Sequence, residues 1–263
     1  MNLLAIESAT NLVGAALVTD GGSAAERSHQ GGRMHAESLA PAIAEVCALS
    51  GLTVRDIDAI AVDTGPGLFT GLRVGVATAK ALAQGLGLGV LAVSSLDILA
   101  AGAREEAGPG GARTVVVVVD ARRGEVFASQ YHFDDAVAGI HQAVDPALAR
   151  QAPPELVTPG GLAESLADRD RGPGESLLIV GDGAVRYRQL LAGVPAADLG
   201  LAEHLSSPSP VTLARLALRR MAAGAEPSAP ADLLPDYRRE ADARINWEQR
   251  IPPPGTPGHD RER

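Results

Sequence analysis

The sequence predicts an α/β fold with two related halves, each a mixed sheet with helices. Strand and helix patterns alternate along the first half, which is typical of sheets covered by helices. Each half opens with an apolar strand, an acidic residue at its end, a tight turn and a returning strand, so that Glu7 and Asp120 correspond. This order indicates a weak internal duplication, although unrelated β-hairpins also look alike.

The first half contains a hairpin, further strands and three helices. Apolar runs bounded by turn residues predict strands at 3–6, 12–20, 24–30, 58–63 and 88–95. Helical spacing of apolar residues predicts helices at 38–51, 70–85 and 96–103. One stripe of the first of these helices holds Leu39, Ile43, Val46 and Leu49.

The second half follows a polar, glycine-rich joint at 104–113. The predicted elements are a hairpin over 114–133, a helix at 161–168, a strand at 177–183 and a helix at 210–224. Residues 233–239 are expected to dock as an extended segment, and the chain after about residue 248 to be disordered. The predicted parts are 1–103, completed by the helix 210–224; 104–209; and a docking segment with a disordered tail over 225–263.

Composition and charge exclude several classes of protein. A formal charge of −9 argues against a chain that holds nucleic acid by a broad basic face. The single cysteine, Cys47, cannot form a disulfide framework or a zinc cluster, which favours a reducing compartment. The start lacks the basic region of a signal peptide, and no apolar run is long enough to span a membrane. We therefore expect a cytoplasmic protein without membrane contact.

The sequence contains no motif of a known catalytic type. The six histidines include no pair at the i, i+3 or i, i+4 spacing that would place two imidazoles on one helical face, so no metal site is expected. The Gly-Pro-Gly turn at 65–67 resembles a phosphate loop, but it fits neither the Walker pattern nor the dinucleotide fingerprint. It suits either an anion contact at a helix N-terminus beside Arg73 or a plain strand-to-helix turn.

Acidic residues stand at the ends of three predicted strands. Glu7, Asp63 and Asp120 could line a cleft for a magnesium-bound nucleotide. The turn after Glu7 lacks a glycine for close phosphate approach, and the arginines at 122 and 123 suit either an anion clamp or a solvated turn. A nucleotide or anion contact is an open hypothesis for Glu7, Gly65, Gly67, Arg73 and Asp120.

The helix expected over 70–85 carries a ridge of small residues. The ridge recurs every four positions and consists of Gly71, Gly75, Ala79 and Ala83. Glycine inside a soluble helix costs about 1 kcal/mol relative to alanine, so two of them need a compensating reason such as close packing. The pattern favours a helix of another protein as the packing element, with the chain's own sheet as the alternative.

Several segments resemble the bacterial TsaB (YeaZ) family. They are 3-LLAIESAT-10, 35-HAESLAPAI-43, 65-GPGLFTGLRVGVATAKALA-83, 94-SSLDILA-100, 120-DARRGEVF-127 and 235-PDYRR-239. The resemblance runs from residue 1 to about 247, and its G-P-G-x-F-T-G-L-R-x-G element is highly specific. It implies a two-domain fold of the actin/Hsp70/sugar-kinase (ASKHA, ribonuclease-H-like) superfamily. Glu7 stands where aspartate is commoner, which weakens the hypothesis of independent nucleotide binding.

The resemblance also implies a non-catalytic subunit. Members are paralogues and partners of TsaD, which transfers a threonylcarbamoyl group to adenosine 37 of tRNA, and they work with TsaE and TsaC-type enzymes. The chain would meet tRNA only through this complex and would have no cofactor or metal of its own. ATP or ADP at the interface with TsaD, and a homodimer in its absence, are open alternatives. Ser95 and Leu99 stand where TsaD carries its metal-binding histidines.

The partner interface of the family is built from its first two helices. The contacts that the resemblance implies are Leu39, Ile43, Val46, Gly71, Arg73, Gly75, Val76, Ala79 and Lys80. We therefore expect Gly75→Arg to abolish the complex with TsaD. The alternative is a stand-alone small-molecule kinase or ATPase of the same superfamily, whose ATP turnover would be lost on Asp120→Ala. A metalloprotease would need the histidine pairs that the sequence lacks.

Overall fold

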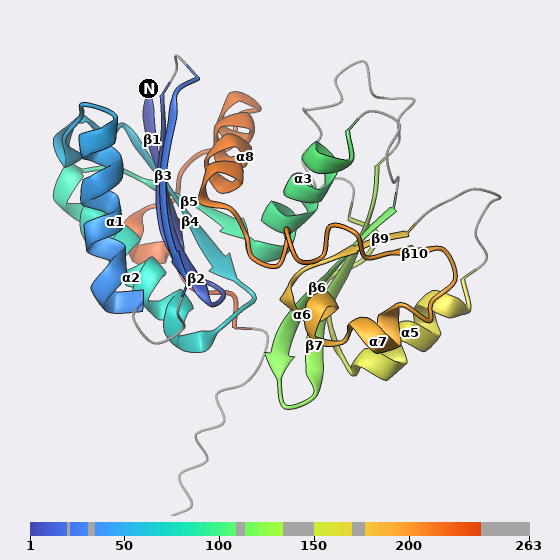
Figure 1. Ribbon diagram of the computed structural model, residues 1–263. Coiled ribbons are helices and arrows are strands. Elements are labelled where there is room, and N and C mark those ends of the chain that lie inside the picture. Colours follow the sequence, from blue (N-terminus) through green and yellow to red (C-terminus); the bar gives the residue numbers. More distant parts are fainter. Residues whose placement is uncertain (20–21, 31–34, 109–113, 134–149, 170–176, 238–263) are drawn as a thin grey trace, which may run out of the picture.

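The computed structural model describes residues 1–19, 22–30, 35–108, 114–133, 150–169 and 177–237. Within these ranges the chain forms two five-stranded mixed sheets that lie side by side, with helices against their faces (Figure 1). The predicted α/β fold with two mixed sheets is confirmed. The disorder predicted after residue 248 concerns residues outside the described part of the chain.

The two sheets share one arrangement of strands. The first has the order β3-β2-β1-β4-β5, and its strands are β1 (Asn2–Glu7), β2 (Leu12–Thr19), β3 (Ala24–Gln30), β4 (Ala59–Gly65) and β5 (Val90–Ser94). The second has the order β10-β9-β6-β7-β8, and its strands are β6 (Thr114–Arg122), β7 (Glu125–His132), β8 (Glu155–Val157), β9 (Leu177–Val180) and β10 (Ala197–Asp198). In each sheet, the first strand pairs antiparallel with the next strand and parallel with a later one. This repeat supports the internal duplication.

Helices form layers on both sides of the first sheet. The helices of the described ranges are α1 (His35–Leu49), α2 (Phe69–Leu86), α3 (Ser95–Ala107), α5 (Pro159–Ala167), α6 (Asp182–Arg186), α7 (Arg188–Leu191) and α8 (Pro210–Ala222). Of these, α5, α6 and α7 pack in the core of the second sheet. The helices α1 and α2 cover one face of this sheet and α8 covers the other (Figure 1). Between the sheets, α3 contributes side chains to the cores of both. None of the helices in the described ranges is long and apolar enough to cross a membrane.

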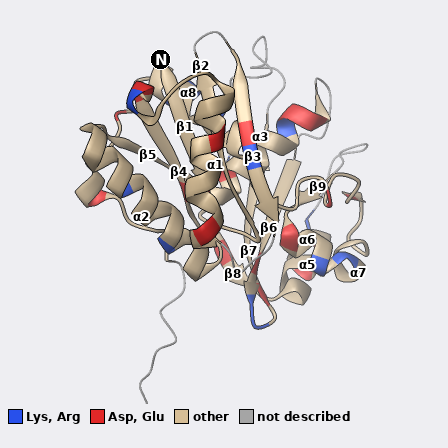
Figure 2. Ribbon diagram, turned by 60° about the vertical axis from the view of Figure 1, so that its left-hand side comes forward, with Lys and Arg blue, Asp and Glu red and all other residues tan. Residues whose placement is uncertain are grey.

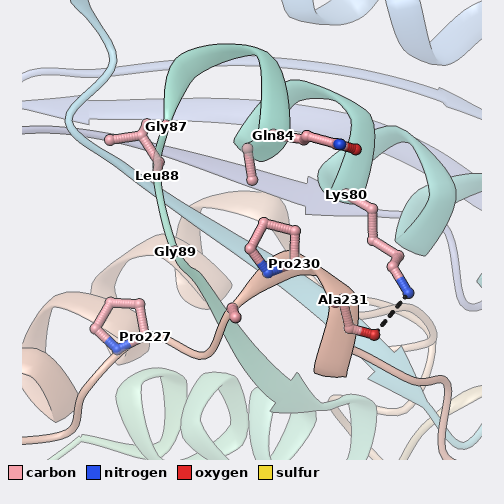
Figure 3. A pocket seen from close by; sticks show the side chains of 10 residues that line it. Lys80, Gln84, Gly87, Leu88, Gly89, Pro227, Pro230 and Ala231 are labelled. Carbon is pink, nitrogen blue, oxygen red and sulfur yellow. Dashed lines mark hydrogen bonds between the residues drawn. The ribbon is translucent and has the colours of Figure 1, made fainter.

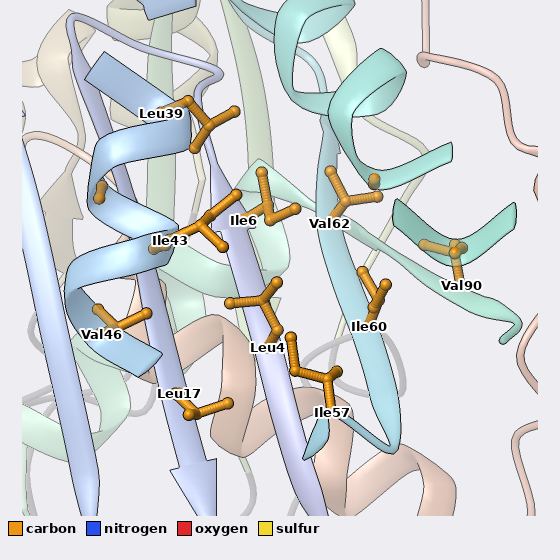
Figure 4. Close-up of a cluster of buried hydrophobic side chains, with 14 of the residues drawn as sticks. Leu4, Ile6, Leu17, Leu39, Ile43, Val46, Ile57, Ile60, Val62 and Val90 are labelled. Carbon is orange, nitrogen blue, oxygen red and sulfur yellow. The ribbon is translucent and has the colours of Figure 1, made fainter. Parts of the chain in front are cut away.

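The apolar stripe of α1 faces the chain's own sheet. Leu39, Ile43 and Val46 are buried in a cluster with Ile6 of β1 (Figure 4). Leu49, which was predicted on the same stripe, is 55% exposed, because the helix ends at this residue. The apolar residues of α1 therefore contribute mainly to folding, since burial of such side chains is the main driving force for it.

The first helix begins three residues earlier than predicted, at His35. The buried imidazole of this residue lies with its Nε2 atom 2.8 Å from the carbonyl oxygen of Thr10. A carbonyl oxygen only accepts, so Nε2 carries the proton and donates it. This bond ties the first turn of α1 to the loop after β1, which gives His35 a structural role.

The ridge of small residues on α2 packs against β1 and the loop that follows it. A side chain at Gly71 would overlap the carbonyl oxygen of Ser8, and one at Gly75 would overlap the hydroxyl of Ser8. That hydroxyl donates to the carbonyl oxygen of Gly71 at 2.9 Å. Ala79 and Ala83 are also fully buried, in the core of the first sheet. The prediction of a partner helix on this ridge is wrong, because a four-residue repeat permits close approach without specifying the surface that approaches.

Residues 227–237, called the strap below, run along α2 and the edge of the sheet. Ser228 and Val90 of β5 exchange backbone hydrogen bonds of 2.9 and 3.0 Å. Leu233 is buried in the same core as α1 and α2. The backbone N–H of Asp236 donates to the carbonyl oxygen of Thr64 at 2.7 Å. The strap thus joins the fold by both backbone pairing and apolar burial.

Two glycine-to-alanine variants of α2 test the role of the ridge. Gly71→Ala should lower the free energy of unfolding by about 1–3 kcal/mol, because the new methyl group overlaps backbone at Ser8. Gly85→Ala should raise it by up to about 1 kcal/mol, since no atom lies within 4 Å of that methyl position and alanine favours helix. Urea denaturation of both variants measures the difference. Equal stability of the two proteins would contradict the packing described.

Candidate functional site

The outer face of α1 is formed largely by alanine. Ala36, Ala40, Ala44 and Ala48 are exposed and recur every four residues, so they make one row along the helix. Glu37 and Glu45 flank this row, and Glu45 is paired with Arg27 of β3 at 3.1 Å. The row is nearly flat, because alanine projects only a methyl group, and a second helix could approach it closely.

The outer face of α2 has the same character. Ala77, Ala81 and Gly85 are exposed and continue a row that starts at Arg73. Figure 2 shows α1 and α2 next to each other on the outside of the molecule, with few charged residues on either helix. We call the two rows together the small-residue face. It consists of Ala36, Ala40, Ala44, Ala48, Ala77, Ala81 and Gly85.

Most of the residues predicted to contact a partner lie on the opposite side of these helices. The buried ones, which cannot reach a partner while the fold is intact, are Leu39, Ile43, Val46, Gly71, Gly75, Val76 and Ala79. Arg73 is exposed and Lys80 is partly so. These seven residues are buried because in a soluble helix the apolar side faces its own core first. The alanine spacing in the sequence carried the signal for the small-residue face.

Arg73 and Lys80 both contact the strap. The Lys80 ammonium donates to the carbonyl oxygens of Ala231 at 3.3 Å and Leu233 at 3.0 Å. Beside it, a hollow of about 540 Å³ lies between α2 and the strap, with Pro227 and Pro230 on its wall (Figure 3). Its lining is mostly alanine, glycine and proline, with few groups that could orient a ligand.

A pair of buried carboxyl groups lies at the ends of β1 and β4. Glu7 and Asp63 follow the paired residues of these two parallel strands and are fully buried. One oxygen of Glu7 accepts from the backbone N–H of Ala9 at 2.7 Å. One oxygen of Asp63 accepts from the backbone N–H of Gly65 at 2.7 Å and from the hydroxyl of Ser95 at 2.6 Å. The second oxygens, Glu7 Oε2 and Asp63 Oδ2, have no other donor among the described residues.

One proton held between these two groups satisfies both. Burial, and next the negative charge of Asp63, raise the pKa of Glu7 well above its usual value. Burial also raises the pKa of Asp63, and the hydrogen bonds from Glu7, Ser95 and Gly65 act against that rise. These directions favour a protonated Glu7, which would then donate to Asp63. The pair is enclosed and internally satisfied, which makes it a structural element rather than a ligand site.

The five residues considered for a nucleotide or anion do not come together. Glu7 is enclosed with Asp63, and Gly65 and Gly67 form a turn in which a side chain at Gly67 would overlap the carbonyl of Ala9. The Arg73 guanidinium lies outside, with its Nε atom donating to the hydroxyl of Tyr237 at 3.0 Å. The close approach of Gly67 to Ala9 is enough to explain the glycine in this turn, and no bound phosphate is required to account for it.

The fifth residue, Asp120, belongs to the other sheet. Its carboxylate forms an ion pair with Arg122 at 3.1 Å, and its backbone N–H donates to the carboxylate of Asp182 at 2.8 Å. Burial raises the pKa of Asp182 to about 6. Asp120 therefore interacts with the turn of its own sheet, and it lies two residues before the end of β6, whereas Glu7 is the last residue of β1.

Ser95 and Leu99, which the resemblance set against the metal-binding histidines of TsaD, both serve the core. Ser95 is fully buried and donates to Asp63, and Leu99 is buried in the core of the second sheet. Over the described part of the chain, no group of three or more histidine, cysteine or acidic residues could hold a metal ion.

The carboxyl pair predicts a pH dependence that Glu7→Gln should remove. When folding raises the pKa of a carboxyl, its contribution to the stability of the folded protein is complete below the unfolded pKa of about 4.3. This contribution is lost as pH rises toward and through the pKa of the folded state. Glutamine keeps a donor for Asp63 and does not ionise. Thermal unfolding at several pH values should therefore show the free energy of unfolding of Glu7→Gln rising relative to that of wild type. The rise should be up to about 1.4 kcal/mol per pH unit above pH 4.3. Parallel stability curves for the two proteins would contradict the shared proton.

Comparison with known proteins identifies the family of this chain. The family described as TsaD: tRNA N6-adenosine threonylcarbamoyltransferase matches residues 24–247. The "tRNA threonylcarbamoyladenosine biosynthesis protein TsaB" of Bacillus subtilis is 29% identical over 249 residues, which are 94% of this chain and 98% of that protein. TsaB of Escherichia coli is 36% identical over 135 residues, which are 51% and 57% of the two chains.

Solved structures give the same result. YeaZ from Pseudomonas aeruginosa matches with a TM-score of 0.70 and 28% identity, over 90% of this chain and 99% of that one. A second structure from that organism, described as similar to peptidase YEAZ, has a TM-score of 0.73 and 29% identity, with the same coverage. The α/β fold with two mixed sheets is thus shared with the YeaZ structures. The chain belongs to the TsaD family and, within it, to the TsaB (YeaZ) proteins of tRNA threonylcarbamoyladenosine biosynthesis.

Proposed function

We propose that this chain is a non-catalytic subunit that binds TsaD through its small-residue face. In that complex it supports transfer of the threonylcarbamoyl group to adenosine 37 of tRNA. The observation that carries the proposal is the pair of exposed rows on α1 and α2, along which two adjacent helices present only alanine methyl groups and glycine. Membership of a family that contains both TsaB and TsaD supports the choice of partner.

Packing geometry supports a helical partner. Rows of residues four apart form ridges, and small side chains allow the ridges of one helix to enter the grooves of another at short interaxial distance. Two adjacent helices facing two helices of a related chain would form a four-helix layer. Stable protein interfaces bury about 1,200–2,000 Å² in total, which two helices of 15 and 18 residues can provide.

The positions of Ser95 and Leu99 support a non-catalytic role. Both side chains are used in packing, and Ser95 is hydrogen-bonded within the enclosed carboxyl pair. In this proposal TsaD supplies the chemistry and the contact with tRNA, TsaE and a TsaC-type enzyme act in the same pathway, and any ATP or ADP lies at the interface with TsaD. The same face could pair two copies of this chain when TsaD is absent.

Charged substitutions on the small-residue face test the proposal. Ala40→Arg and Ala81→Arg should each weaken binding to TsaD at least about a hundredfold, because a buried unpaired charge opposes docking. Ala222→Arg is the matched control, since Ala222 is also an exposed helical alanine but lies in α8, which packs on the opposite face of the sheet. Isothermal titration calorimetry gives the Kd, and formation of threonylcarbamoyladenosine in the reconstituted system should fall in parallel.

Binding by both face variants at wild-type strength would contradict the proposal. Gly75→Arg, which the sequence suggested for this test, is unsuitable. Its side chain would enter the buried contact between α2 and Ser8 and disrupt the fold itself.

A further inference from the structure

A cluster of two aromatic rings and one arginine lies at the start of α2. The rings of Phe69 and Tyr237 have their centroids 5.1 Å apart and are tilted by 39°. The guanidinium carbon of Arg73 lies 3.8 Å from the centroid of the Phe69 ring. The Nε atom of Arg73 donates to the hydroxyl of Tyr237 at 3.0 Å. These contacts fix the arginine between a helix residue and a strap residue.

The cluster lies on the surface, whereas three of the other four phenylalanine and tyrosine rings in the described part of the chain are buried and Tyr187 is half-buried. Phe69 is 43% exposed and Tyr237 is 44% exposed, whereas Phe127, Tyr131 and Phe133 are all buried. Three residues before Tyr237 on the strap, Leu234 is 72% exposed, although its neighbour Leu233 is in the core. Exposed apolar groups that gather in one place, rather than singly, mark an interaction surface.

The composition of the cluster is that of an interface anchor. Aromatic residues and arginine dominate the small set of positions that carry most of the binding energy in protein complexes. Arg73 is held in place before any partner arrives, which lowers the entropic cost of binding. Among the described residues its two terminal nitrogens have no hydrogen-bond partner, and the first turn of α2 contains no acidic residue. The cluster can therefore accept a carboxylate at its centre.

The position of the cluster continues the small-residue face. Arg73 is the first residue of the exposed row that runs through Ala77 and Ala81. A partner that lies along this row reaches the rings at its end. The methyl row gives close approach with little side-chain entropy lost, and the rings add the large apolar groups that the row lacks.

We propose that Phe69, Arg73, Leu234 and Tyr237, called the ring anchor, form the energetic centre of the interface with TsaD. The partner surface has an apolar hollow that receives the rings and Leu234, and a carboxylate that pairs with Arg73. The inference rests on the proposed function, and it adds a contact from the strap to an interface of two helices. The strap is then part of the binding site, and Lys80 and Leu233 position it for binding.

Single substitutions in the ring anchor give the direct test. Phe69→Ala, Arg73→Ala and Tyr237→Ala should each raise the Kd for full-length TsaD at least about tenfold. Tyr237→Phe keeps the ring and should raise it less than Tyr237→Ala. Leu190→Ala is the matched control, because Leu190 is 52% exposed but belongs to α7 near the second sheet, and it should leave the Kd within about twofold. Circular dichroism checks that each variant is folded.

A second measurement does not depend on folding energetics. Leu234→Cys, labelled with a benzophenone maleimide, should cross-link to TsaD on irradiation, whereas Leu190→Cys with the same label should not. Cys47 is buried and is not expected to react in the folded protein.

The outcomes separate the two proposals. If wild type binds TsaD and all three alanine variants bind within twofold of it, the ring anchor is wrong and the small-residue face stands. If wild type does not bind TsaD at all, the proposed function fails. An exposed ring pair with an arginine could instead stack an unpaired nucleobase. Binding of a single-stranded oligouridine by the chain alone, lost in Tyr237→Ala, would overturn the protein anchor in favour of RNA.

Discussion

The close contact between α2 and β1 determines how the rest of the first domain is arranged. Gly71 and Gly75 bring the helix against Ser8, and the hydroxyl of Ser8 closes the contact with a hydrogen bond to Gly71. The same approach presses the Gly-Pro-Gly turn onto the loop after β1. The helix then needs few large side chains where it meets β1, and its exposed row beyond Arg73 is also formed by small residues. Helix α2 therefore has two rows of small residues, one that packs against β1 and one that faces outward.

The strap completes this arrangement. It pairs with the edge of β5, buries Leu233 and receives hydrogen bonds from α2 through Lys80 and Arg73. Helix α2 is therefore held on one side by the sheet and on another by the strap. Each sheet also carries a buried acidic residue at or near the end of its first strand, Glu7 in β1 and Asp120 in β6. At Glu7 the carboxyl shares a proton with Asp63, and at Asp120 it pairs with Arg122.

Sequence patterns predicted where strands and helices lie better than they predicted which face of a helix is exposed. The predicted strands and helices are close to their observed ranges, because apolar periodicity reports burial. The short elements β8, α6, α7 and β10 were not predicted, since they contain too few residues to show a period. The resemblance implied Leu39 and Ile43 as partner contacts, and both are buried against the chain's own sheet. The proton shared by Glu7 and Asp63 could not be predicted either, since it depends on two strands distant in sequence becoming neighbours.

The central claim is that α2 folds with one row of small residues and binds with the other. Methyl NMR of alanine-labelled protein, titrated with unlabelled TsaD, tests this most directly, because each row has its own alanine signals. The account predicts that the signals of Ala40, Ala44, Ala77 and Ala81 shift or broaden, while those of buried Ala79 and Ala83 change little. Large changes at Ala79 and Ala83, with none on the outer rows, would contradict it.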